Sequence, residues 1–237
     1  MTDSVVVQRP ADAAQQLILL FHGVCGHPRE MLRLGQRLGA EFPSAMIVSV
    51  AAPHTCGRGA GRQWFSVQGI SEENRVRRVQ EAMPAFVAAV RHWQKESGIG
   101  APATALVGFS QGAIMALEST LHGASLAGRV ASIAGRFALL PSAVTPDTTL
   151  HLFHGKTDAV IAYAHTLAAA ERMLELGGDV TADVLPFVGH EINDTIESLL
   201  IERLRGYIPR RLWEEALRAD CESPPMVSVR PVNRRLH

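Results

Sequence analysis

Short apolar runs alternate along this chain with longer segments in which apolar residues recur every three or four positions. Unbroken apolar runs of this kind are typical of strands that a parallel sheet buries on both faces. The longer segments have the period of amphipathic helices that pack against such a sheet. The pattern predicts strands at residues 17–21, 45–50, 103–109, 129–135, 149–155 and 180–187.

Helices are expected in the connections between these strands. The apolar spacing places them at 29–41, in a long segment after Ser71, at 163–176 and at 191–205. Ser71 precedes two glutamates, which is typical of a helix N-cap, and Pro84 is expected to kink or restart the long helix. Because strand and helix alternate repeatedly, we predict an α/β fold with a mostly parallel, doubly wound sheet and helices on both faces.

One domain is expected to contain all of these elements, at residues 1–206. Residues 207–237 are expected to form a short helix at 209–219, followed by a tail rich in proline and arginine that frays or lies on the surface. The larger part shows no internal repeat and no linker that would divide it.

Composition and charge argue against a nucleic-acid-binding, membrane-inserted or secreted protein. The 237 residues contain 47% hydrophobic residues, and 23 basic residues cancel 23 acidic ones, so we expect no nucleic-acid partner. The N-terminal segment has only the short apolar run 17–21, which is neither a signal peptide nor a membrane span, and we expect no stable insertion into a membrane. Three cysteines without a CxxC pair favour free thiols in a reducing compartment, and we predict a cytoplasmic location.

A serine between two glycines follows the apolar run at 103–109. Gly108, Ser110 and Gly112 match the pattern G-x-S-x-G between a predicted strand and a helix-like segment. In such a turn the backbone of the serine is strained and its hydroxyl is exposed, while the glycines leave out the Cβ atoms that would clash. The free N–H groups of the following helix would stabilise an oxyanion. The alternative is an ordinary loop with a capping serine.

A serine nucleophile needs a base, and the base needs an acid that orients it. Asp158 and His190 each follow one of the later strands, so they lie at the same edge of the predicted sheet as Ser110 and in the order serine, acid, histidine. The other acids considered stand before strands or at their start: Asp147, Asp179 and Asp183. His151 and His154 are three residues apart on one strand, so they point to opposite faces and are poor candidates for a shared metal. We predict a Ser110, Asp158 and His190 triad and no metal.

The oxyanion hole needs a second donor, which this kind of fold takes from the loop after an early strand. His22-Gly23-Val24 follows the run at 17–21, so the backbone N–H groups of Val24 and Gln111 are the predicted pair. The alternative is that His22 and Gly23 only end a strand.

The motifs LLFHG, GRQWFS, GFSQGAIMAL, HGKTDAVI and VGHEI together resemble the phospholipase/carboxylesterase family of α/β-hydrolases, over about residues 15–206. The resemblance implies a hydrolase with almost no lid, Ser110 as nucleophile, Asp158 and His190 as its partners, and Val24 and Gln111 as oxyanion donors. The first loop departs from the family pattern HGxGD, because Cys25 replaces a glycine there. If this position needs a positive φ, the loop must be rearranged or strained.

A few further residues are candidates for the wall of the substrate pocket. Trp64 and Phe65 could form a wall of the acyl pocket, although aromatic pairs are more often core residues, and Arg136 follows the predicted strand 129–135 and could lie at the pocket edge. Glu118 is expected to be a structural carboxylate.

The sequence therefore predicts an esterase that cleaves short- to medium-chain carboxylic esters through an acyl-enzyme. It needs no cofactor, takes a small-molecule ester as its partner, and is a monomer or homodimer. The other interpretations are an acyl-protein thioesterase or lysophospholipase, a peptidase, and a non-catalytic binding module that kept the fold.

Overall fold

A computed structural model describes residues 3–57 and 59–222 of the chain, with side chains up to residue 218. The chain divides into two compact units, Met1–Tyr207 and Ile208–His237. In the second unit one helix is described, α6 (Arg210–Glu222). The rest of the Pro- and Arg-rich tail, which the sequence predicts to fray, lies outside the described residues.

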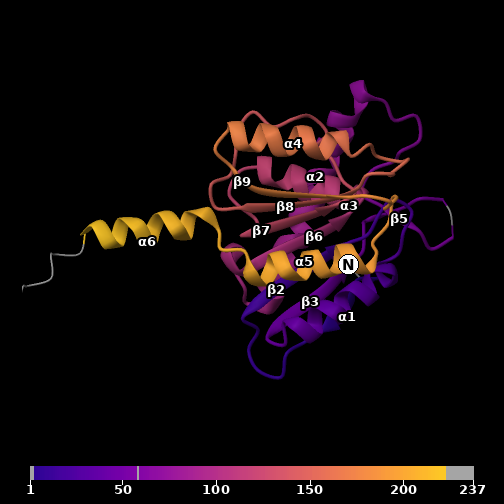
Figure 1. Ribbon diagram of the computed structural model, residues 1–237. Coiled ribbons are helices and arrows are strands. Elements are labelled where there is room, and N and C mark those ends of the chain that lie inside the picture. Colours follow the sequence, from indigo (N-terminus) through magenta and orange to yellow (C-terminus); the bar gives the residue numbers. More distant parts are fainter. Residues whose placement is uncertain (1–2, 58, 223–237) are drawn as a thin grey trace, which may run out of the picture. The chain divides into compact units, whose positions relative to one another are not determined.

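A seven-stranded sheet forms the centre of the first unit, in the order β1-β3-β2-β6-β7-β8-β9 (Figure 1). All neighbouring strands are parallel except β1, which pairs antiparallel with β3 at one edge. The strands are β1 (Val5–Gln8), β2 (Gln16–Phe21), β3 (Ala45–Val50), β6 (Thr104–Phe109), β7 (Arg129–Ile133), β8 (Thr149–Gly155) and β9 (Asp179–Leu185). A separate two-stranded hairpin pairs β4 (His54–Thr55) with β5 (Arg62–Gln63).

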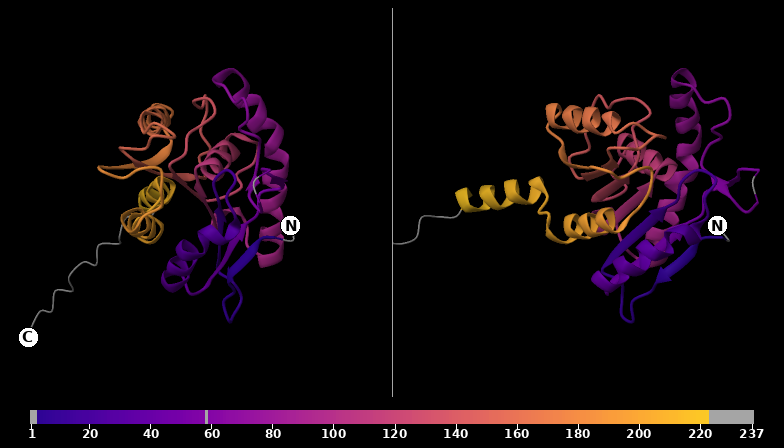
Figure 2. Two further views of the ribbon diagram at one scale, coloured as in Figure 1. Left: turned by 90° about the vertical axis from the view of Figure 1, so that its right-hand side faces the viewer. Right: turned by 45° about the vertical axis from the view of Figure 1, so that its right-hand side comes forward.

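Helices cover both faces of this sheet, which Figure 2 shows as three layers. The helices α2 (Glu72–Ser97), α3 (Gln111–Glu118) and α4 (Ala164–Glu175) pack on one face, and α1 (Leu32–Glu41) and α5 (Asp194–Gly206) pack on the other. Short 3₁₀ turns occur at Pro28–Met31, Ala101–Ala103 and Ser119–Leu121. Among the residues that the structure describes, no helix is both long enough and apolar enough to span a membrane.

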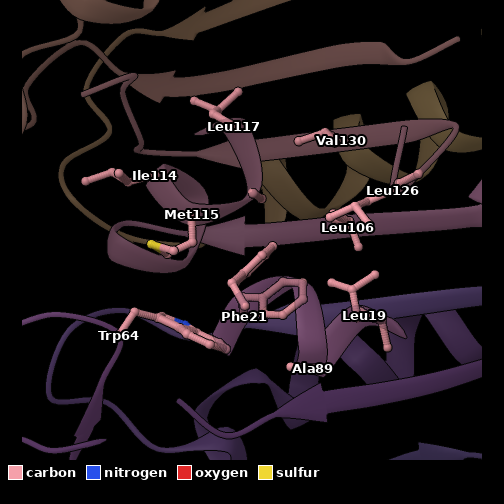
Figure 3. Packing of buried hydrophobic residues seen from close by; sticks show 14 of the residues in the cluster. Leu19, Phe21, Trp64, Ala89, Leu106, Ile114, Met115, Leu117, Leu126 and Val130 are labelled. Atoms are coloured by element: carbon pink, nitrogen blue, oxygen red, sulfur yellow. The ribbon is translucent and has the colours of Figure 1, made fainter. Parts of the chain in front are cut away.

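The period-two geometry of a strand explains why the apolar runs are unbroken. Leu17, Leu19 and Phe21 of β2 point into the core under α2 and α3, whereas Ile18 and Leu20 point into the core under α1 and α5. Figure 3 shows Leu19 and Phe21 among the side chains of the first core. A strand buried in this way needs an apolar residue at every position, as the sequence indicates.

The predicted fold is confirmed, with two additions, and one of the two alternatives expected for Pro84 is excluded. The edge strand β1 and the small hairpin were not predicted, because a four-residue run and two-residue strands are too short to stand out in a sequence pattern. Pro84 does not restart the long helix: α2 continues from Glu72 to Ser97 through it. Burial of Phe86 and Val90 on its sheet-facing side offsets the hydrogen bond that a proline cannot make.

Candidate active site

Three side chains from different loops meet at the carboxyl edge of the sheet. Ser110 follows β6, Asp158 follows β8 and His190 follows β9. His190 Nε2 lies 2.9 Å from Ser110 Oγ, and His190 Nδ1 lies 2.7 Å from Asp158 Oδ2. The ring of Phe109 packs 5.1 Å from the imidazole of His190, between ring centroids, and limits its rotation. The structure therefore brings the three predicted residues into one hydrogen-bonded chain.

Ser110 stands in a strained turn between β6 and α3. Its φ of 53° and ψ of −115° are rare for a residue with a side chain, and its N–H is held by the carbonyl of Ile133 at 2.9 Å. Close packing of the turn explains the two glycines: a Cβ on Gly108 would lie 2.4 Å from Ala113 N, and one on Gly112 would lie 2.3 Å from Phe21 O. The turn thus places Ser110 at the N-terminus of α3, where N–H groups have no acceptor within the helix.

The carboxylate of Asp158 is fully buried and completely hydrogen-bonded. Its Oδ1 accepts from the N–H groups of Val160 and Ile161 at 2.8 and 2.9 Å, and its Oδ2 faces His190. Burial alone would raise the pKa of Asp158, but the hydrogen bonds from His190 and the two backbone groups outweigh it and hold the pKa below the ordinary value. A negative charge on Asp158 fixes the imidazole with Nδ1 protonated and Nε2 free to accept from Ser110.

His154, which sequence reasoning gave no role at this site, lies beside the same carboxylate. Its Nε2 is 3.2 Å from Asp158 Oδ2 and 2.8 Å from the carbonyl of Ile161, while its Nδ1 contacts Thr166 Oγ1 at 2.7 Å. Burial lowers the pKa of His154, so the neutral ring donates from Nε2. It thereby supports the loop that carries Asp158. The position at the end of β8, four residues before the acid, was the only sequence signal for this contact.

The loop after β2 carries the predicted oxyanion donor Val24. The ring of His22, which is 1% exposed, contacts the carbonyl of Gly23 through Nδ1 at 2.8 Å and accepts from the N–H of Ala52 through Nε2. Burial lowers the pKa of His22, which keeps the ring neutral for both contacts. Cys25 adopts a φ of 55°, the left-handed conformation that a glycine would take without strain.

Cys25 is joined to Cys56 by a disulfide, with the two Cα atoms 5.4 Å apart. The expectation of free thiols is therefore wrong for these two residues. They are 31 residues apart in the sequence, so no short motif marks the pair. They meet because β2 and β3 are parallel neighbours, and the loops that follow them leave the sheet at the same edge.

The side chain of Gln111 ties the residues after β5 to the nucleophile turn. Its Oε1 accepts from the N–H of Trp64 and its Nε2 donates to the carbonyl of Phe65, both at 2.8 Å. Trp64 itself lies in the core near Phe21 (Figure 3), and its ring packs against those of Phe21 and Phe86. It does not line the cavity that contains Ser110, whereas Phe65 does.

This cavity has a volume of about 300 Å³, which is at the small end of the range for ligand sites. Ser110, Val24 and Gln111 line it together with the predicted pocket residue Arg136 and with Arg75 and His165, which sequence reasoning did not assign to the site. The remaining wall is mostly apolar: Phe65, Val67, Ile70, Ile114, Val160, Ile161 and Ala162.

The rival acidic residues have structural contacts. Asp183 forms a bidentate ion pair with Arg203, and Asp179 accepts from Tyr207 Oη and Thr149 Oγ1. Glu118 accepts from the N–H of Ala138 at 2.6 Å, and its burial raises its pKa, in keeping with a structural carboxylate. His151 contacts Thr181 and His154 contacts Thr166, which confirms that the two rings point away from each other.

A model of the phospholipase/carboxylesterase family matches residues 2–203. The chain belongs to this family. It is 50% identical over 215 residues, 91% of this chain and 93% of the other, to the esterase YpfH of Escherichia coli K12. The predictions of the family and of an enzyme that acts on ester bonds are therefore confirmed.

Solved structures of other proteins share the fold of this carboxylesterase-family chain. The esterase PE8 superposes with a TM-score of 0.74 at 27% identity, covering 84% of this chain and 97% of PE8. Acyl-protein thioesterase 2 of Zea mays superposes with a TM-score of 0.67 at 20% identity, covering 85% of this chain and 96% of the thioesterase. At this identity the likeness shows only a shared fold.

Proposed function

We propose that this esterase cleaves short- to medium-chain carboxylic esters through an acyl-enzyme formed on Ser110. The observation that carries the proposal is the hydrogen-bonded chain from Ser110 through His190 to Asp158, open to a cavity with apolar walls. A histidine placed in this way can take the proton from the serine hydroxyl, and a buried carboxylate keeps its ring in the required tautomer.

The reaction then takes two steps. In the first, Ser110 Oγ attacks the ester carbonyl while His190 Nε2 takes its proton and passes it to the departing alcohol. In the second, His190 removes a proton from water and the resulting hydroxide attacks the acyl group on Ser110. The bond from the acyl carbon to Ser110 Oγ then breaks, His190 returns its proton to Ser110 Oγ, and the carboxylic acid is released. The negative oxygen formed in each step would be stabilised by the N–H groups of Val24 and Gln111.

The size of the cavity supports a limit on acyl length. Each methylene that finds apolar contact gains about 0.8 kcal/mol, and one left in water gains almost nothing. With about 300 Å³ available, we expect kcat/KM for p-nitrophenyl esters to rise from acetate to butyrate or hexanoate and then to fall. A panel of acyl chains measured with esters and with thioesters tests this. Fastest cleavage of palmitoyl substrates would replace the short-chain assignment with an acyl-protein thioesterase or lysophospholipase.

The assignment of the nucleophile has a direct test. A fluorophosphonate probe should label the parent protein, and Ser110→Ala should lose both labelling and ester hydrolysis, with turnover reduced by roughly several orders of magnitude. Ser66→Ala is a matched control, because the Ser66 hydroxyl accepts a hydrogen bond from the N–H of Gln68 in its own loop and takes no part in the triad. Hydrolysis that persists in Ser110→Ala would refute the mechanism and leave a binding module or another nucleophile.

The cytoplasmic location also stays a prediction. The Cys25–Cys56 disulfide counts against it, since glutathione and thioredoxin keep most cytosolic cysteines reduced. The oligomeric state, monomer or homodimer, is likewise a prediction, and size-exclusion chromatography with light scattering would measure it.

A further inference from the structure

We infer that the acyl pocket recognises substrates whose acyl chain ends in a carboxylate, and that Arg75 is the residue that binds it. The inference rests on the proposed function, because it names a substrate class for the same site. It starts from the charges on the pocket wall. Two guanidinium groups, those of Arg75 and Arg136, line the cavity that contains Ser110, and no carboxylate does so among the described residues.

Arg136 is fully engaged by protein groups. Its Nη1 and Nη2 donate to the two oxygens of Glu72 at 3.0 and 2.8 Å, and its Nε donates to the carbonyl of Phe137. Its Nη1 also faces His165 Nε2 at 3.1 Å. Burial lowers the pKa of His165 and the positive charge of Arg136 lowers it further, so the neutral ring accepts this hydrogen bond. Arg136 therefore shapes the pocket and has little capacity left for a ligand.

The guanidinium of Arg75 has hydrogen-bond donors that no protein group uses among the described residues. Its one ion pair within the described part of the chain joins Nη2 to Glu72 at 3.1 Å, although its side chain is only 17% exposed. Its Nε is buried and has no hydrogen-bond partner among the described residues. Leaving a charged donor buried without an acceptor costs free energy, so the charge of Arg75 is poorly compensated and an anionic acceptor at its Nη groups would stabilise it.

The charge balance favours an anionic acceptor. Glu72 is shared between Arg75 and Arg136, and its side chain is 63% exposed to solvent. One carboxylate against two guanidinium groups leaves a net positive charge beside a small, largely apolar cavity. A guanidinium binds a carboxylate in a planar, two-point geometry, and the Nη hydrogens of Arg75 that Glu72 does not use are available for this contact. The apolar wall would contact the methylenes between the ester and the terminal carboxylate.

The test compares three p-nitrophenyl esters with the same six-carbon acyl chain. Hexanoate ends in a methyl group, and the adipate monoester ends in a carboxylate, at a chain length where self-cleavage through a small ring is not favoured. In the parent enzyme we expect kcat/KM to be higher for the adipate monoester than for its methyl-capped diester, which has the same chain but no charge. Adipate itself should inhibit hexanoate hydrolysis more strongly than hexanoic acid does.

The decisive variant is Arg75→Gln. We expect its kcat/KM for the adipate monoester to fall by about tenfold to a hundredfold relative to hexanoate, mainly through KM, as charge-assisted hydrogen bonds are lost. Arg75→Lys should recover part of the preference. Arg77→Gln removes the same charge from the same helix, but Arg77 is 64% exposed and pairs with Glu81, so the ratio should not change.

An unchanged adipate-to-hexanoate ratio in Arg75→Gln, with hexanoate cleaved at the parent rate, would overturn the inference and leave the proposed function intact. A parent enzyme that cleaves neither ester, or a Ser110→Ala variant that cleaves both, would instead refute the proposed function. If Arg75→Gln does not fold, inhibition of the parent enzyme by adipate decides: no preference for adipate over hexanoic acid contradicts the inference.

Discussion

Backbone strain is concentrated at residues around the site. Ser110 and Cys25 both have positive φ, at 53° and 55°, although neither is a glycine. Each such conformation costs about 1–3 kcal/mol and persists only where the surrounding structure holds it. At Ser110 the turn between β6 and α3 exposes the hydroxyl, and at Cys25 the loop is held by the disulfide and by the neighbouring Gly26, whose carbonyl accepts from Arg62 N.

Replacing Asp158 by asparagine should abolish most of the activity while the protein still folds. An amide at this position no longer favours the tautomer of His190 that accepts from Ser110, so kcat should fall by about 10³–10⁴-fold. Stopped-flow or steady-state hydrolysis of p-nitrophenyl butyrate measures this. Asp183→Asn is the matched control: it removes a carboxylate that pairs with Arg203, so it should lower stability and leave kcat/KM near the parent value. The opposite outcome would move the acid to Asp183.

At the scale of elements, the site is built from loops that follow parallel strands. The loop after β2 carries Val24, and the longer connection after β3 carries Cys56 and the β4–β5 hairpin. Several links join these loops, including the Cys25–Cys56 disulfide, the bridge between Gly26 and Arg62 and the hydrogen bond from Ala52 N to His22 Nε2. Because the bridge and the His22 ring also hold this loop, the disulfide should matter more for stability than for the placement of Val24.

Reduction of the disulfide should therefore destabilise the protein without abolishing activity. For a separation of 31 residues the loss of loop-closure constraint corresponds to about 3–4 kcal/mol, as an upper estimate. Urea unfolding with and without dithiothreitol measures the effect, and kcat/KM should change by less than about tenfold. Cys56→Ser should unfold alike in both conditions. Equal midpoints for the oxidised and reduced parent protein would contradict the prediction.

Over the whole molecule, the catalytic residues lie at one edge of the sheet, and a separate cluster of structural polar contacts lies at the other. Ser110, Asp158 and His190 follow the carboxyl ends of strands, whereas Arg129, Thr149 and Asp179 begin strands at the other edge. There Arg129 donates to the carbonyls of Arg203 and Tyr207, which anchors the end of α5. Burial and the contact with Asp179 raise the pKa of Tyr207 to about 12. These contacts hold the scaffold together and leave the other edge for chemistry.

His151, on β8, couples the stability of this scaffold to pH. It is fully buried, contacts Thr181 and packs edge-on against Tyr207, and burial lowers its pKa from 6.5 to about 4. Arg129 and Arg203 lower the pKa and Asp179 and Asp183 raise it. Between pH 6.5 and 4 the unfolded chain binds a proton at this residue and the folded chain does not, so stability falls as pH falls, by about 3 kcal/mol in total.

Urea unfolding between pH 7 and pH 4 tests this coupling. In His151→Gln the contribution of this residue is absent, so the free energy of unfolding should decline less steeply with falling pH than in the parent. His92→Gln, at an exposed position on α2, should keep the parent slope. If the free energy of unfolding depends on pH in the same way in the parent and in His151→Gln, the prediction that His151 lowers stability as pH falls is wrong.

The sequence by itself determined the order of strands and helices, because periods of apolar residues follow directly from the geometry of each element. It also pointed to Ser110, Asp158 and His190. Parallel strands bring their carboxyl ends to one edge, so residues far apart in the sequence can be placed together without knowing any side-chain contact. The replacement of a glycine by Cys25 also predicted a rearranged or strained loop if this position requires a positive φ. Cys25 has a φ of 55° in the structure.

Only the tertiary structure decided which side chains touch. The Cys25–Cys56 disulfide, the contact of His154 with Asp158 and the presence of Arg75 in the same cavity as Ser110 follow from no periodic spacing in the sequence. Trp64 and Phe65 are adjacent in sequence, yet one packs in the core and the other lines the cavity. Whether a side chain enters the core or the cavity depends on how its loop packs against the neighbouring helices. The local sequence pattern does not determine that packing.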